Sequence, residues 1–189
     1  YPQNEMTGYD KMLDTAIMLG VYEPRNTEEY YELCRGKNCL EMTKWFNTNY
    51  HYLVPEISTD TKFELNWSNR YSKWYQKPIH LIGPYTFLKL SKGSFDFKTK
   101  LSELTDIYLE ILNKKHSYRS FHFDEPAFVM DTTPEEIEMI KEVYTKLSDK
   151  ADNINIFTYY EDVDWLRELF KLPVNGIGLD FVNGRNNLR

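Results

Sequence analysis

Residues 121–159 read FHFDEPAFVMDTTPEEIEMIKEVYTKLSDKADNINIFTY, in which two short apolar runs flank a longer amphipathic segment. The runs Phe121–Phe123 and Asn155–Tyr159 have the length of buried strands. Thr133-Pro134-Glu135-Glu136 predicts a helix start, because threonine can cap, proline fits the first turn and the second glutamate completes a capping box. The apolar stripe of this helix follows at spacings of three and four residues: Ile137, Ile140, Tyr144 and Leu147. A strand, a helix and a second strand in succession indicate parallel pairing through a right-handed crossover.

The same alternation continues on both sides of this unit. Further helices are predicted over Tyr9–Leu19, Phe97–Asn113 and Asp162–Leu172. Further strands are predicted over Tyr50–Val54, Ile79–Ile82 and Gly176–Phe181. This order indicates an α/β fold with a parallel sheet. A closed (β/α)8 barrel takes about 250 residues, so five predicted strands in 189 residues indicate an incomplete barrel of the TIM type.

Polar residues lie at or just after the ends of most predicted strands. In parallel α/β sheets the carboxyl ends of the strands hold the functional site. We therefore expect any site of this chain to be formed by the residues at these positions, which are Glu56, Asp124, Glu125, Tyr160, Glu161 and Asp180.

Composition limits the compartment and the partners. Acidic residues outnumber basic ones by 29 to 23, and the net charge of −6 disfavours binding to nucleic-acid phosphates. No apolar run reaches the roughly 18–20 residues that a membrane span needs. Cys34 and Cys39 are too few for a disulfide scaffold and indicate reduced thiols. We expect one cytoplasmic domain without nucleic-acid or membrane partners. Because the chain opens at Tyr1, we also expect it to be a piece of a longer protein.

The strongest ligand-binding pattern lies in residues 41–56, which read EMTKWFNTNYHYLVPE. Lys44 is a cationic donor suited to a carboxylate or a phosphate, and Asn47 and Asn49 offer amide donors and acceptors. His51 adds an imidazole to the same stretch. The alternative is a structural strand whose aromatic flank lies in the core while Lys44 is solvated. Composition alone leaves both interpretations open.

Two further motifs have both a functional and a structural interpretation. Asp124 and Glu125 could share a proton or bind a metal. However, neighbouring strand residues point to opposite faces, so a structural pair that caps the next loop is an equal alternative. Gly83-Pro84-Tyr85-Thr86 could shape a pocket floor, but glycine and proline after a strand favour a plain turn.

The sequence gives little support for a metal site. Its four histidines are scattered, whereas a catalytic zinc needs three protein ligands. His122 and Asp124 lie two residues apart and so share one face of a strand, which leaves one weak candidate. A glycoside-hydrolase-like role for Asp124 or Glu125 would need a second carboxylate at a suitable spacing, which the sequence does not supply. We expect neither catalytic residues nor a bound metal in this chain.

Residues 41–56 resemble the signature of the cobalamin-independent methionine synthase family, in its N-terminal half. Other segments follow in the order of the family, so that the resemblance covers essentially the whole chain. These segments are Tyr9–Ala16, Lys77–Leu88, Asp124–Ala127, Thr158–Tyr160 and Leu172–Gly176. The resemblance implies that residues 1–189 form about strands 2 to 6 of an N-terminal (β/α)8 barrel, without the catalytic C-terminal barrel.

The family transfers a methyl group from 5-methyltetrahydropteroyltri-L-glutamate to L-homocysteine to make methionine. By this resemblance, zinc belongs to the C-terminal barrel, where it binds homocysteine as a thiolate, and no cofactor belongs to this chain. The N-terminal barrel serves as a scaffold and binds the glutamate tail of the folate. The resemblance assigns Lys44 to this tail, and Asn49 and His51 are weaker candidates because they lie nearby.

The resemblance implies an enzyme only for the full-length protein, so we expect this chain alone to be inactive. Its partners would be the methyltetrahydropteroyl-polyglutamate and the C-terminal barrel of the same protein. The Asp124-Glu125-Pro126 motif would be a remnant that shapes the strand end. The alternative is a stand-alone, non-catalytic folate-binding or structural module derived from that barrel.

Overall fold

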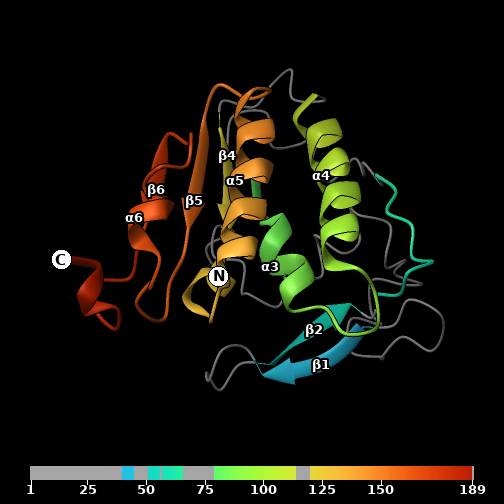
Figure 1. Ribbon diagram of the computed structural model, residues 1–189, viewed down its shortest axis with the longest axis horizontal. Coiled ribbons are helices and arrows are strands. Elements are labelled where there is room, and N and C mark those ends of the chain that lie inside the picture. The colour runs from blue at the N-terminus through green and yellow to red at the C-terminus, as the bar shows by residue number, and fades with distance from the viewer. Residues whose placement is uncertain (1–39, 45–50, 56, 66–78, 114–119, 189) are drawn as a thin grey trace, which may run out of the picture.

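The computed structural model describes residues 40–44, 51–55, 57–65, 79–113 and 120–188. Its strands are β1 (Leu40–Lys44), β2 (His51–Pro55), β3 (Ile79–Ile82), β4 (Phe121–Asp124), β5 (Ile154–Phe157) and β6 (Gly176–Gly178). Its α-helices are α3 (Pro84–Lys89), α4 (Phe97–Asn113), α5 (Pro134–Ser148) and α6 (Leu166–Leu169). Short 3-10 helices lie at Pro126–Val129 and Arg185–Leu188. Figure 1 shows α4 and α5 standing side by side in front of the sheet.

The strands β3, β4, β5 and β6 form a parallel sheet in sequence order. One register line runs from Ile82 through Asp124 and Phe157 to Gly178. This arrangement confirms the predicted α/β fold with a parallel sheet. Closure into an eight-stranded barrel stays a prediction.

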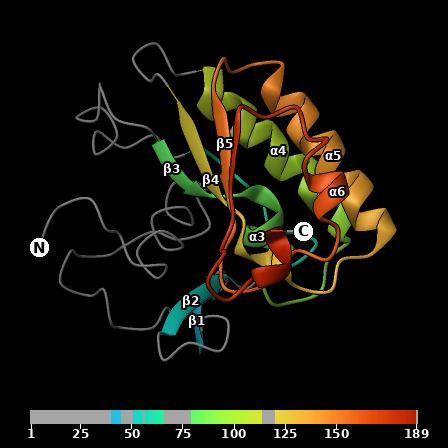
Figure 2. The same ribbon diagram turned by 90° about the vertical axis from the view of Figure 1, so that its left-hand side faces the viewer.

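The core lies between this sheet and its helices. Figure 2 shows α4, α5 and α6 on one face of the sheet. Phe123 of β4 is fully buried, with its ring 5.6 Å from that of Tyr108 on α4 and 6.2 Å from that of Tyr144 on α5. Burying a side chain of this size contributes about 1.5–3 kcal/mol. The Tyr108 hydroxyl donates to the Ile82 carbonyl oxygen, which ties α4 to β3.

The helix signals in the sequence are confirmed for α4 and α5. Helix α4 has the predicted bounds. At the start of α5 the Thr133 hydroxyl accepts from the Glu136 N–H at 3.2 Å. The Glu136 carboxylate in turn accepts from the Thr133 N–H at 2.9 Å, so the capping box is complete.

Two predicted elements near the C-terminus are too long. The helix predicted over Asp162–Leu172 shortens to α6, because the Asp162 carboxylate accepts from the backbone N–H and the side-chain amide of Asn186 instead of capping a helix. The strand predicted over Gly176–Phe181 ends at Gly178. Here Asp180 turns the chain, since its carboxylate accepts from the N–H groups of the two residues at 182 and 183.

The prediction that Tyr50–Val54 belongs to the parallel sheet is wrong. These residues contribute to β2, which pairs antiparallel with β1 in a separate two-stranded sheet. Only six residues separate the two strands, whereas a parallel crossover needs a dozen or more. Strand β1 itself was not predicted. Tyr50 and the helix predicted over Tyr9–Leu19 lie outside the described residues.

The predicted plain turn at Gly83–Thr86 is also wrong, because Gly83 is followed directly by helix α3. Pro84 occupies the first position of this helix, where its missing N–H is tolerated. Just after α3 the backbone forms hydrogen bonds with the residues at the end of β2. The Lys92 N–H donates to the Pro55 carbonyl oxygen at 2.9 Å, and the Ile57 N–H donates to the Lys92 carbonyl oxygen at 2.7 Å.

Within the described ranges, no helix has both the length and the apolar character needed to cross a membrane.

Candidate functional site

The carboxyl ends of the four parallel strands meet at one edge of the sheet, where α/β proteins place their functional sites. Strand β3 leads to Gly83 and α3, and β4 ends in Asp124 and Glu125. Strands β5 and β6 lead to Tyr160 and Asp180. The β1–β2 sheet lies at the same end of the molecule, below α3 in both views (Figures 1 and 2).

Glu125 is a fully enclosed carboxyl group at this edge, with none of its surface exposed. Its carboxylate accepts from the Tyr85 N–H at 3.3 Å and from the Thr86 N–H at 2.7 Å, both at the start of α3. The Tyr144 hydroxyl of α5 donates to it at 2.6 Å. A Cβ atom on Gly83 would lie 2.1 Å from the Glu125 carboxyl carbon, so only glycine fits there. The two motifs that sequence reasoning weighed separately therefore form one unit.

Burial raises the pKa of Glu125 to about 7, while the donors from Thr86, Tyr144 and Tyr85 act in the opposite direction. Burial also raises the pKa of the Tyr144 hydroxyl, and the nearby Glu125 charge raises it further. The Tyr144 proton therefore stays on the phenol near neutral pH. Glu125 is the member of this pair that changes its charge in the neutral range.

Asp124 is also buried, and its charge affects the pKa of Tyr159 after β5. Burial raises the pKa of the Tyr159 hydroxyl, and the Asp124 charge is the next cause. The donors to Glu125, by contrast, come from α3 and α5. These contacts support the structural interpretation of Glu125, which caps the helix that follows β3 from the end of β4.

The loops after β5 and β6 are joined by a second carboxylate. Tyr160 has a backbone φ of 90°, which is strained for a residue with a side chain, and its N–H donates to the Asp180 carboxylate at 3.1 Å. Asp180 also accepts from the Val182 N–H and from the Asn183 N–H and side-chain amide. The hydrogen bonds from Asn183 and Val182 hold the pKa of Asp180 below its usual range. Asp180 is therefore a charged, fully bonded anchor of the loop.

Two of the three sequence-predicted binding residues, Lys44 and His51, fall on the β1–β2 sheet. Its register pairs Lys44 at the end of β1 with His51 at the start of β2. Asn49 lies between these strands, outside the described residues. Their proposed role in binding stays a prediction.

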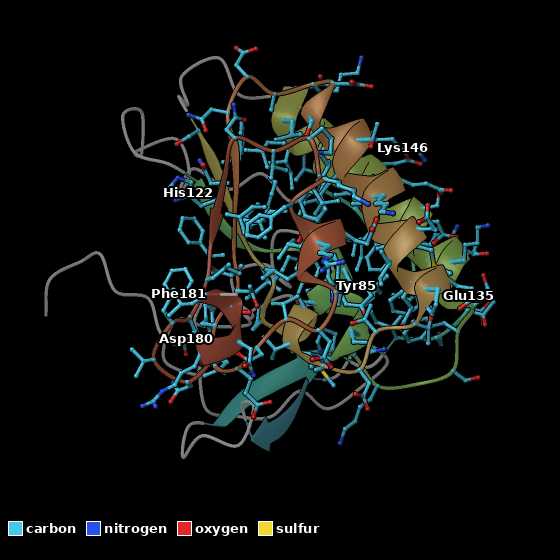
Figure 3. The ribbon with its side chains drawn as sticks, turned by 60° about the vertical axis from the view of Figure 1, so that its left-hand side comes forward. Tyr85, His122, Glu135, Lys146, Asp180 and Phe181 are labelled. Atoms are coloured by element: carbon cyan, nitrogen blue, oxygen red, sulfur yellow. The ribbon has the colours of Figure 1, made fainter. Side chains whose placement is uncertain are left out.

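The candidate metal pair does not gain a third ligand in the described part of the chain. There, no group of three or more His, Cys, Asp or Glu side chains could hold a metal ion. His122 packs against Phe157, with 5.1 Å between the ring centroids, and its Nε2 lies 3.4 Å from the Ser120 Oγ. Figure 3 shows His122 on the side of the sheet away from the helices. Cys34 and Cys39 lie outside the described residues.

An open cleft of about 490 Å³, which sequence reasoning missed, lies between α4 and the segment after β2. One of its two lysines is Lys100, which donates to the Thr61 carbonyl oxygen at 2.7 Å and to the Glu103 carboxylate at 2.6 Å. Lys62 and Asp60 add one charge of each sign. This lining, with two acidic and two basic side chains, favours neither an anionic nor a cationic ligand. No sequence signal pointed to the cleft, because its two sides lie about 40 residues apart in the chain.

The comparisons with known proteins agree on one family. The family model for the N-terminal domain of the cobalamin-independent synthase matches residues 1–189. Proteins named 5-methyltetrahydropteroyltriglutamate–homocysteine methyltransferase are 39 % identical in Herpetosiphon aurantiacus, 38 % in Bacillus cereus and 37 % in Thermotoga petrophila.

These alignments cover 97–100 % of the chain but only 27–28 % of the relatives' length. They confirm the family resemblance seen in residues 41–56. The chain belongs to the cobalamin-independent synthase family, as an N-terminal domain sequence.

Proposed function

We propose that this chain binds the glutamate tail of 5-methyltetrahydropteroyltri-L-glutamate, within a methyltransferase that converts homocysteine to methionine. The activity is carried over from relatives that bear this substrate in their name. The observation that supports the binding role is the register of the β1–β2 sheet, which sets Lys44 opposite His51 at the end of the sheet. A triglutamate tail is a polyanion, so it favours a site that offers cationic and imidazole groups.

The proposed role is binding and orientation. A single exposed lysine–carboxylate pair contributes about 0.2–1 kcal/mol, so Lys44 would tune affinity, with Asn49 and His51 as further polar contacts. The carboxyl edge of the sheet would serve as scaffold, because Glu125 and Asp180 are already fully engaged with backbone donors.

The family's zinc would bind homocysteine and lower the pKa of its thiol, so that the substrate reacts as the nucleophilic thiolate. The described residues of this chain do not fit that metal, since they hold no group of three candidate ligands. We therefore assign zinc to the C-terminal barrel and derive no step of the reaction through this chain. That barrel would be the chain's partner, in the cytoplasm.

The parallel sheet would be one wall of a (β/α)8 barrel, with β3 to β6 as consecutive strands. Their sequence order and the helices on one face are what such a barrel needs. The β1–β2 sheet would then lie at the mouth of the barrel.

The test is a calorimetric titration of the protein with 5-methyltetrahydropteroyltri-L-glutamate at low salt, beside Lys44→Ala. Lys146→Ala is the matched control, since Lys146 is an exposed lysine on α5 (Figure 3). We expect saturable binding that added salt weakens, and a loss of up to about fivefold in Lys44→Ala. Lys146→Ala should bind like the wild type.

Equal binding by the wild type and Lys44→Ala would refute the assignment of Lys44. The absence of binding by a folded protein would refute tail binding as a whole. Saturable binding without methyl transfer by this chain alone fits both hypotheses, so methyl transfer to homocysteine is measured again with the C-terminal barrel added. Transfer in that mixture supports the enzyme, and its continued absence favours the stand-alone binding module.

A further inference from the structure

Two hydrogen-bonded junctions connect Glu125 to the β1–β2 sheet. At the first, the Glu125 carboxylate accepts from the N–H groups of Tyr85 and Thr86 at the start of α3. At the second, just after α3, Lys92 exchanges two backbone hydrogen bonds with Pro55 and Ile57 at the end of β2. Helix α3 lies between the two junctions, and Figure 1 shows it above β2.

Helix α3 depends on the first junction. It has only six residues, and a helix of that length is not stable in isolation. The N–H groups at the start of any helix need acceptors, but Gly83 at its N-cap offers no side chain. Glu125, about 40 residues further along the chain, supplies these acceptors.

We propose that Glu125 is a positioning residue: its carboxyl group fixes α3, and α3 fixes the β1–β2 sheet that carries Lys44 and His51. Only the ligand in this inference rests on the proposed function. The two junctions are contacts of the fold, and they can be tested without any ligand.

The junction should respond to pH. The phenol of Tyr144 on α5 donates to Glu125, and the Glu125 charge also acts on the phenols of Tyr85 on α3 and Tyr159 after β5. Asp124 is its neighbour in the chain. Burial raises the pKa of Glu125 to about 7, so the folded junction favours the neutral carboxyl group. An opening of α3 that admits water restores the ordinary pKa. By linkage, ionisation of Glu125 above neutral pH therefore favours the open junction.

The test is hydrogen–deuterium exchange at the amides of Ile57 and Lys92, corrected for intrinsic rates, between pH 6 and pH 8. Glu125→Ala removes the acceptors, and we expect exchange at these two amides to rise by about tenfold or more. Glu125→Gln keeps the size and one acceptor but carries no charge. We expect it to restore most of the protection and to abolish the loss of protection that the wild type shows as pH rises.

Glu135→Gln is the matched control. Glu135 is exposed on α5, so this substitution makes the same chemical change away from the junction (Figure 3). It should keep the wild-type pH dependence. Unchanged exchange at Ile57 and Lys92 in Glu125→Ala would overturn the proposal. So would a rise that also spreads evenly over β4 and β5, because that reports general destabilisation. If Glu125→Ala does not fold, equal pH dependence in the wild type and Glu125→Gln would overturn it.

A binding measurement then separates this inference from the proposed function. The probe is 5-methyltetrahydropteroyltri-L-glutamate, titrated at pH 6 and pH 8 into the wild type and Glu125→Gln. His51 and the tail carboxylates are the same in both proteins, so the difference between them isolates Glu125. We expect the wild type to lose at least about fivefold more affinity than Glu125→Gln as pH rises. Binding with equal pH dependence in both proteins would overturn the coupling, while exchange results as expected without any binding would refute only the tail site.

Discussion

The buried carboxyl group of Glu125 gives the protein a stability that depends on pH with a sign opposite to that of most acids. Burial raises its pKa from 4.5 to about 7, so between these values the folded state binds more protons than the unfolded state. Stability from this group is therefore fully present below about pH 4.5 and is lost as pH rises through about 7. Each pKa unit corresponds to about 1.4 kcal/mol, so the loss amounts to roughly 3 kcal/mol.

Glu125→Gln removes this titration and nearly preserves the side-chain volume. We expect the free energy of unfolding of Glu125→Gln to gain roughly 3 kcal/mol relative to the wild type between pH 5 and pH 8. Urea unfolding at pH 5, 6, 7 and 8 measures this difference, in which the contributions of all other titrating groups cancel. Glu135→Gln should follow the wild type at every pH. A difference between Glu125→Gln and the wild type that stays constant over this range would refute the reasoning.

Three further predictions concern the contacts around this unit and the helix beside it. Tyr144→Phe removes a donor to Glu125 and should move the loss of stability to higher pH, which the same urea series detects; an unmoved midpoint would contradict the contact. Gly83→Ala pushes a Cβ atom to within 2.1 Å of the Glu125 carboxyl carbon and should destabilise the protein by about 1–3 kcal/mol. Thr133→Ala breaks the capping box with Glu136 and should lower the unfolding free energy by about 1 kcal/mol; Thr145→Ala, at an exposed position within α5, should lack this capping loss.

The sequence predicted the elements whose signals are local. Helix α4 and the capping box of α5 were found because their determinants lie within a few residues of one another. The bond from Glu125 to the start of α3 was missed, since it joins residues about 40 positions apart. That distance is also why Gly83 was interpreted as part of a turn rather than as the entry to a helix.

In the candidate site, too, the local sequence signal was found and the long-range contact was missed. The family follows from residues 41–56, which carry its signature, but the antiparallel pairing of β1 with β2 does not follow from periodicity. A short apolar run looks the same in a parallel and an antiparallel sheet. Lys44 and His51 are cross-strand neighbours because of the register of that pairing, which only the folded chain supplies.

The separation between α3 and Glu125 has a consequence for synthesis on the ribosome. Helix α3 leaves the ribosome before Glu125, which lies about 40 residues downstream. At about 5–20 residues per second, that lag is roughly 2–8 seconds. During this interval the nascent chain presents an unanchored helix and an undocked two-stranded sheet, both dependent on a segment not yet translated. The pace of translation through residues 90–125 therefore sets how long α3 and the β1–β2 sheet stay open to chaperones and to wrong partners.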